Sequence, residues 1–206
     1  MNIKVLDCTL RDGGYYNNWD FDDSLVQKYL IAMSMAKVDI VEIGFRFLPQ
    51  KKFLGKFAYS KDNFLTTLNL PSNISYAVMI NASDFINHEN GFKSALNLLF
   101  SSKKDSPIDI VRIATHASDL KNCRSIAKTL KDLGYKVFLN IMQISSLDSK
   151  SIAKSSKEVK SWNCIETLYF ADSFGNMEPD SISSVISSLS SYWNGSIGLH
   201  THDNKN

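Results

Sequence analysis

The feature that most constrains the fold is an alternation of short, almost continuously apolar runs with longer stretches that show helical periodicity. Runs of this kind are typical of parallel strands whose two faces are both covered. The alternation therefore predicts repeated β–α units around a parallel sheet. We find seven runs: IKVLD (3–7), DIVEIG (39–44), SYAVMI (75–80), DIVRIA (109–114), YKVFLNI (135–141), ETLYFA (166–171) and SIGLH (196–200).

Between these runs, apolar residues recur at spacings of three and four, which indicates helices with one face on the sheet. Gly134 after Leu133 indicates a helix end, and Pro179 after Glu178 indicates a helix start. The Ser-rich stretch 145–191 keeps an apolar stripe, so we interpret it as ordered helix surface. The stripes are Val26, Tyr29, Leu30 and Met33; Phe92, Ala95, Leu96 and Leu99; Cys123, Ile126, Ala127 and Leu130; and Ile182, Val185, Ile186 and Leu189.

Seven strands indicate a TIM-type (β/α)8 barrel that lacks one unit. A closed barrel of this type has eight strands and commonly about 250 residues, whereas this chain has 206 residues and stops a few residues after the seventh run. We therefore expect residues 1–206 to form a single barrel domain that is truncated at its C-terminus. The open strand edges make association into a homo-oligomer one expected state.

Composition and charge favour a cytoplasmic protein that binds a small molecule. The chain is 44% hydrophobic and carries a net charge of +2, with basic and acidic residues intermixed. This pattern argues against a nucleic-acid surface or a membrane-binding patch. Three widely spaced cysteines favour reduced thiols, and neither a signal peptide nor a membrane-spanning run is evident.

The connection over 45–62 is longer than most connections in β–α units. It contains Arg46, Lys51, Lys52 and Lys56. We treat it as a candidate active-site lid, with a plain solvated loop as the alternative.

Residues at the ends of the first and last runs predict a divalent-metal site. Side chains alternate along a strand, so His200 and His202 point to the same side. Asp12 follows the first run, at the barrel face where active sites lie. Two imidazoles and one carboxylate leave coordination positions open, as a catalytic metal requires. Such a site fits Mn²⁺, Mg²⁺, Co²⁺ or Zn²⁺.

The same segments carry a family resemblance. DCTLRDGG (7–14) resembles the first-strand signature of the DRE-TIM metallolyases, and HTHDN (200–204) resembles their seventh-strand metal motif. DIVRIATH (109–116) and YFADSFGNMEP (169–179) are similar to the fourth and sixth strands of the 4-hydroxy-2-oxovalerate aldolase branch. The resemblance covers essentially the whole chain in the right order.

This resemblance implies a lyase that breaks or forms a carbon–carbon bond through a pyruvate-type enolate. Asp12, His200 and His202 would bind the metal, with Mn²⁺ as the first expectation, and Arg11 would stabilise the enolate oxygen. The substrate would be a 2-oxo acid or a hydroxy-oxo acid. For Arg11 the alternative is a surface salt bridge.

One position departs from the aldolase branch, which usually has a histidine base three residues after the ligand aspartate. Here that position is Tyr15, and a phenol is a weaker base at neutral pH. Candidates for proton transfer are Tyr15, Tyr16 and His116, the last with an ordinary loop histidine as the alternative. Further polar residues on or after strands would line the pocket, support the ligands or simply pack inside the barrel: Asp7, Glu42, Arg112, Asn140 and Asp172.

Two competing functions remain open. The first is an acyl-CoA-using Claisen condensation, whose enzymes generally resemble TLRDGEQ at the first strand. Gly14 and Tyr15 replace the Glu and Gln of that motif, which counts against it. The second is a catalytically inactive chain that binds metal without turnover.

Overall fold

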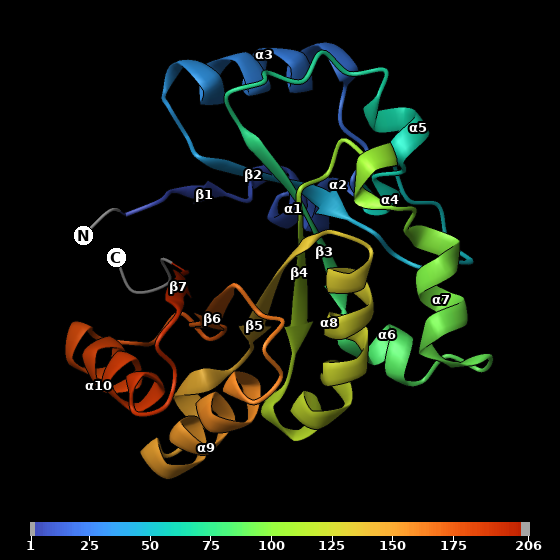
Figure 1. Ribbon diagram of the computed structural model, residues 1–206. Coiled ribbons are helices and arrows are strands. Elements are labelled where there is room, and N and C mark those ends of the chain that lie inside the picture. The colour runs from blue at the N-terminus through green and yellow to red at the C-terminus, as the bar shows by residue number, and fades with distance from the viewer. Residues whose placement is uncertain (1–2, 203–206) are drawn as a thin grey trace.

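A computed structural model describes residues 3–202 as seven parallel strands alternating with helices (Figure 1). The sheet order is β1-β2-β3-β4-β5-β6-β7, and every neighbouring pair is parallel. The predicted alternation is thus confirmed, and with it the predicted fold class, a TIM-type barrel with seven strands among the described residues. The strands are β1 Leu6–Asp7, β2 Ile40–Phe45, β3 Ser75–Asn81, β4 Ile110–Thr115, β5 Lys136–Ile141, β6 Thr167–Ala171 and β7 Ser196–His200.

The helices follow the predicted stripes. The four stripes lie in α3, α7, α8 and α10, and the Ser-rich stretch holds α9 and α10, as expected. Gly134, at φ +96°, directly follows Leu133, the C-terminal cap residue of α8. Pro179 is the first residue of α10. The α-helices are α1 Thr9–Asp12, α2 Gly14–Asn17, α3 Asp23–Met35, α4 Lys56–Tyr59, α5 Asp62–Leu65, α6 Ala82–Ile86, α7 Gly91–Leu99, α8 Cys123–Asp132, α9 Ser149–Lys160 and α10 Pro179–Ser190; short 3-10 helices are η1 Lys103–Asp105, η2 Ala117–Asn122 and η3 Ile144–Ser146.

The sheet curls so that its two faces bury different sets of residues. The large core lies between the convex face and the helices, while a small cluster of Ile40, Ala77, Ile110 and Phe138 packs on the concave face. A cavity of about 680 Å³ occupies the concave side, and its lining extends from Leu6 on β1 to residues 196–200 on β7. Residues from all seven strands therefore line this one cavity.

The two edge strands differ from the interior of the sheet. β1 is shorter than the predicted run 3–7. Ile3 and Val5 of that run lie before the strand and are 79% and 54% exposed. Among residues 3–202, β1 is paired with β2 alone, and β7 with β6 alone. Figure 1 shows β1 (blue) and β7 (red) on the same side of the molecule, as the two margins of the curled sheet.

The connection 45–62 is not a free lid. Arg46 is 1% exposed, and its guanidinium donates to the carbonyl oxygens of Ser60 at 3.2 Å and Leu99 at 2.8 Å. The same group pairs with Asp62 and lies 4.8 Å from the centre of the Phe100 ring. Arg46, near the start of the connection, thus joins its far end to the end of α7, so our interpretation of Arg46 as a lid residue was wrong. A lid role for the exposed Lys51 and Lys52 stays a prediction.

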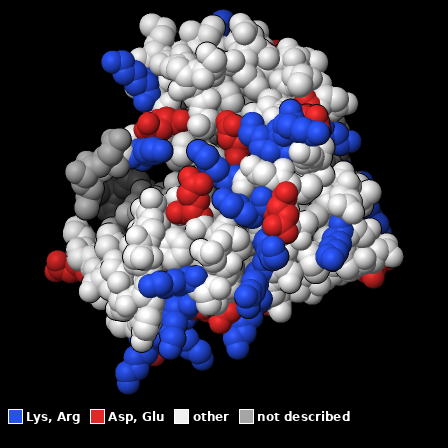
Figure 2. All heavy atoms as spheres, viewed as in Figure 1, with Lys and Arg blue, Asp and Glu red and all other residues white. Residues whose placement is uncertain are grey.

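The surface carries both charge signs. Figure 2 shows Lys and Arg side chains beside Asp and Glu side chains across the centre of one face, with basic side chains gathered at the lower edge, where α9 lies. Helix α9 carries Lys150, Lys154, Lys157 and Lys160. Within residues 3–202, none of the helices has the length and apolar character needed to cross a membrane.

Candidate metal centre

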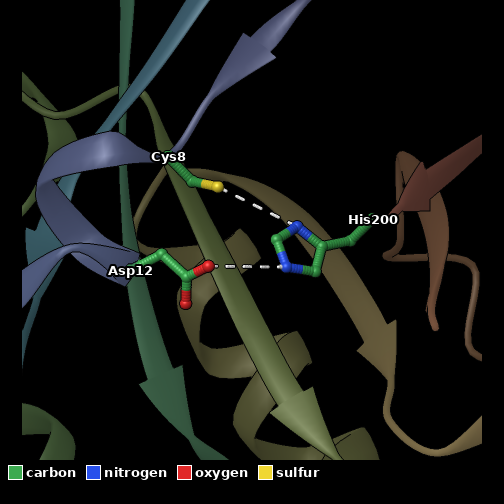
Figure 3. A group of neighbouring side chains, drawn as sticks. All are labelled: Cys8, Asp12 and His200. Carbon is green, nitrogen blue, oxygen red and sulfur yellow. Dashed lines mark hydrogen bonds and ion pairs between the residues drawn. The ribbon is translucent and has the colours of Figure 1, made fainter. Parts of the chain in front are cut away.

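The three predicted metal ligands lie at the two margins of the sheet. Asp12 is the last residue of α1, which begins two residues after β1. His200 is the last residue of β7, and His202 follows two residues later. The curl of the sheet brings these margins together, and Figure 3 shows Asp12 pointing at the imidazole of His200.

The donor atoms of these residues converge. His200 Nε2 and His202 Nε2 are 3.3 Å apart, and each lies 3.9 Å from Asp12 Oδ2. The point equidistant from these three atoms is about 2.2 Å from each, close to the bonds of about 2.0–2.2 Å that divalent metals form with imidazole and carboxylate. The residues present therefore fit a divalent cation without rearrangement.

The hydrogen bond behind His202 fixes its tautomer. Its Nδ1 lies 2.7 Å from the backbone carbonyl oxygen of Asp172, which can only accept. The proton of a neutral His202 is therefore on Nδ1, and the lone pair is on Nε2. The carboxylate of Asp172 accepts the backbone N–H groups of Asn176 and Met177, both at 3.1 Å, and so holds the turn after β6 in place.

His200 is contacted at both ring nitrogens. Its Nε2 faces Asp12, and its Nδ1 lies 3.9 Å from Cys8 Sγ (Figure 3). Burial, followed by the charges of Arg112 and Arg11, lowers the pKa of His200 to about 4. Burial also raises the pKa of Cys8 to about 11. At neutral pH, His200 is thus a neutral imidazole, the form that binds metal, and Cys8 is a thiol.

Arg11 is buried beside the ligands and held by two carboxylates. Its Nη1 donates to Asp12 Oδ1 at 2.6 Å, and its Nε donates to Glu42 Oε1 at 2.7 Å. Burial opposes the charged form, but the anions Glu42 and Asp12 outweigh it and raise the pKa of Arg11. Arg11 is 6% exposed, so the alternative of a surface salt bridge does not apply.

Glu42 connects Arg11 to a second buried cation. Arg112 donates from Nη1 to Glu42 Oε2 at 3.1 Å and from Nη2 to Asn140 Oδ1 at 3.1 Å. Burial favours the neutral acid, yet Arg112 and Arg11 lower the pKa of Glu42 below its ordinary value. Arg112 also stacks 4.5 Å from the Tyr169 ring centre. Glu42, Arg112 and Asn140 thus form an ionic layer under the ligands.

Tyr15 packs against an aromatic cluster next to Arg11. Its ring is edge-on to Trp19 at 4.9 Å and to Phe45 at 6.0 Å, although the residue is 60% exposed. Partial burial raises the pKa of Tyr15, so the phenol is protonated at neutral pH. Tyr16 is 95% exposed and has no such support.

Trp19 has an unusual backbone conformation for a bulky residue. Its φ is +57°, in the left-handed region, and its Nε1 donates to the carbonyl oxygen of Arg11 at 2.7 Å. A Cβ on Gly14 would lie 2.0 Å from the Trp19 ring, so only glycine fits at that position. Strained residues of this kind concentrate at functional sites. Trp19 holds the backbone between Arg11 and Tyr15.

The other predicted residues lie farther from the ligands. His116 is exposed, at the start of η2 after β4, and its side chain contacts none of the three ligands among residues 3–202. Asp7 accepts hydrogen bonds from the Thr9 N–H at 2.9 Å and from the Tyr29 hydroxyl, and so fixes the start of α1.

Two residues of the site were not found from the sequence. Cys8 is part of the first-strand motif, and its place one turn before Asp12 is the signal that could have identified it. For Trp19 the only signal is the pair Gly13 and Gly14 earlier in the same segment, because neither a left-handed backbone nor a ring contact is visible in the sequence.

Two bacterial proteins are similar to this chain over nearly its whole length. A protein of Geobacillus genomosp. 3 is 25% identical over 98% of the chain, and one of Pelotomaculum thermopropionicum is 23% identical over 98%. Both are named 4-hydroxy-2-oxovalerate aldolase. The chain spans 58% and 57% of their respective lengths. No protein-family model matches the chain.

Solved structures share the fold. The N-terminal domain of a "putative aldolase" from Bacteroides vulgatus is 30% identical, with a TM-score of 0.83 over 99% of this chain and 66% of that one. The carboxyl transferase domain of Rhizobium etli pyruvate carboxylase, at 13% identity, has a TM-score of 0.72 over 98% of this chain and 36% of that one. The resemblance stated from the motifs is therefore confirmed: along 98% of its residues, this chain is similar to proteins named 4-hydroxy-2-oxovalerate aldolase.

Proposed function

We propose that this protein is a divalent-metal-dependent carbon–carbon lyase of the aldolase type, acting on a 2-oxo acid or a hydroxy-oxo acid. The observation that carries this proposal is the convergence of Asp12 Oδ2, His200 Nε2 and His202 Nε2 around one point, with Arg11 beside it. The names of the similar proteins support the same reaction class.

Asp12, His200 and His202 would hold the metal. When bound, a divalent cation there supplies Lewis-acid polarisation of a carbonyl oxygen, which favours formation of an enolate. Mn²⁺ is our first choice, because two imidazoles and one carboxylate suit it and leave positions open.

Arg11 would stabilise the negative charge that develops on the substrate oxygen. Its Nε and Nη1 are occupied by Glu42 and Asp12, whereas Nη2 has no partner among residues 3–202. These two contacts fix the plane of the guanidinium before substrate binds, so it needs no reorganisation during the reaction. One preorganised donor of this kind is typically worth about 3 kcal/mol.

Tyr15 and His116 are the candidates for proton transfer. A protonated phenol is suited to give its proton to the aldehyde oxygen as the new carbon–carbon bond forms. This donor role suits Tyr15, because burial raises its pKa and keeps the phenol protonated. Tyr15 is the stronger candidate, because its ring packs in the aromatic cluster beside Arg11, whereas His116 is exposed after β4.

The double variant His200→Ala/His202→Ala tests the proposal. Calorimetric titration with Mn²⁺ should show binding to the unmodified chain and none to this variant, because two of three ligands are removed. His88→Ala is the control, since His88 lies on the connection between α6 and α7. Retained Mn²⁺ affinity in the double variant would overturn the metal site.

Substrate competition tests the reaction class. The Mn²⁺-loaded chain should turn over pyruvate plus an aldehyde rather than a 2-oxo acid plus acetyl-CoA. Turnover with the thioester alone would replace the aldolase proposal by the Claisen condensation. Mn²⁺ binding without turnover of either pair would support a non-catalytic metal-binding chain.

A further inference from the structure

The two histidines of the metal centre are held from behind by different groups. The Nδ1 of His202 meets a backbone carbonyl oxygen at 2.7 Å, whereas the Nδ1 of His200 meets the sulfur of Cys8 at 3.9 Å. A carbonyl oxygen only accepts hydrogen bonds, while a thiol both donates and accepts weakly. The orientation of His202 is thus set by the main chain, and that of His200 by one side chain.

Cys8 and Asp12 belong to the same turn. Cys8 is the N-terminal cap residue of α1, and the N–H of Asp12 donates to the Cys8 carbonyl oxygen at 2.8 Å. The two side chains approach opposite nitrogens of the same imidazole (Figure 3). One rigid turn after β1 therefore clamps the ring that ends β7.

We propose that Cys8 is a positioning residue of the metal centre, whose sulfur accepts the Nδ1–H of His200 and keeps Nε2 directed at Asp12 and His202. This inference rests on the proposed function, because it presumes a metal at those three atoms. Cys8, Asp12 and His200 also lie close enough together to hold a metal ion among themselves, but the Cys8 sulfur faces His200 Nδ1, whereas Asp12 faces Nε2, so we assign Cys8 the supporting role. Partners behind a metal-binding histidine fix its tautomer and its orientation.

The ability of the thiol to reverse its hydrogen bond has a measurable consequence. Without metal, the two Nε2 atoms lie 3.3 Å apart, within reach of a hydrogen bond that needs one proton between the rings, and His202 keeps its own proton on Nδ1. That proton is then on His200 Nε2, and the Cys8 S–H donates to His200 Nδ1. With metal bound, the His200 proton moves to Nδ1 and donates to the sulfur. His200 keeps one proton throughout and changes tautomer.

Two substitutions at position 8 separate the hydrogen bond from packing. Cys8→Ala removes the acceptor, and Cys8→Ser replaces it by a hydroxyl of similar size. By calorimetry, Mn²⁺ should bind Cys8→Ala about 10–100-fold more weakly than the unmodified chain. Cys8→Ser should bind more tightly than Cys8→Ala but more weakly than the unmodified chain, because its oxygen also accepts the Nδ1–H but lies farther from His200 on its shorter bond. Cys164→Ala is the matched control, as Cys164 is a buried thiol outside the site.

The tautomer itself is read by ¹⁵N NMR of the histidine rings, with diamagnetic Zn²⁺ as the probe. His200 should carry its proton on Nε2 in the metal-free chain and on Nδ1 with Zn²⁺, and the Nδ1 signal of Zn²⁺-bound His200 should shift in Cys8→Ala, because that proton loses its acceptor. Unchanged Mn²⁺ affinity together with an unchanged Nδ1 signal in Cys8→Ala would overturn the role of Cys8 alone. Failure of the unmodified chain to bind either metal would overturn this inference and the proposed function together.

Discussion

The interior strands and the edge strands of the curled sheet differ in how deeply their side chains are buried and in the polar groups that they place. All residues of β2 and β4 are buried, whereas those of β1 are half-buried and β7 contains only half-buried and exposed residues. The interior holds Glu42 between two arginines, and the margins hold the proposed metal ligands. The difference separates two tasks, because fixed charges need a rigid, dry setting, whereas an ion or a substrate needs access.

The two regions are linked by Arg11. One of its nitrogens contacts Glu42 in the interior, and another contacts Asp12 at the margin. The position of the marginal carboxylate is thus set from the interior. Four substitutions or conditions test this separation, beginning with the interior.

Glu42→Gln should have the largest effect on stability. It leaves Arg112 buried without a carboxylate and Arg11 with Asp12 alone, and breaking a buried pair in this way typically costs about 3–5 kcal/mol. Urea unfolding measures the loss. The control is Glu166→Gln, which removes an exposed partner 4.0 Å from Lys136 and should cost about 0–1 kcal/mol. Similar small losses for both variants would mean that the interior charges are not stabilised by pairing.

Asp12→Asn should affect binding far more than folding. Loss of one of three ligands should weaken Mn²⁺ affinity by about a hundredfold or more. Its side chain is 35% exposed, so the free energy of unfolding should change by about 1 kcal/mol or less. Calorimetric titration and urea unfolding of the same preparation provide both values. A stability loss as large as that of Glu42→Gln would erase the distinction between margin and interior.

Gly14→Ala should disturb the segment that joins the margin to the aromatic cluster. The added Cβ would lie 2.0 Å from the Trp19 ring, and such overpacking typically costs about 1–3 kcal/mol. Mn²⁺ affinity should fall as well, because Trp19 holds the Arg11 carbonyl group. Gly91→Ala, which adds a Cβ in open space at φ +77°, is the control for backbone strain alone. Equal Mn²⁺ affinity in both variants would contradict the proposed bracing by Trp19.

The last test concerns acid stability of the metal-free chain. The folded pKa of His200 is about 4, against 6.5 for the ordinary group, so the unfolded state binds more protons between these values. Stability should therefore rise with pH from about 4 to 6.5, by at most about 1.4 kcal/mol per pH unit, and then level off. Urea unfolding across this range should show a shallower slope for His200→Gln than for His88→Gln. Identical slopes would show that His200 is not desolvated.

The fold could be predicted almost completely, because its signals are local. Strands covered on both faces must be apolar throughout, and helices on a sheet must repeat at three and four residues, so both periods are visible in the chain. Two features were missed. The short helices α1, α2, α4, α5 and α6 have no apolar stripe long enough to predict them. At β1, the apolar run is longer than the strand. Ile3 and Val5 lie at a margin without a second neighbouring strand, which the sequence does not reveal.

The site could be predicted only in part. The sequence by itself determined the strands, the resemblance and the choice of Asp12, His200 and His202, because strand alternation and motif spacing act over a few residues. Tertiary structure decided which partners support them: Cys8 behind His200, Glu42 between two arginines, and Trp19 against Gly14. It also decided that Arg46 is buried. These contacts join residues up to 192 positions apart, and only the curl of the sheet determines which of these residues meet.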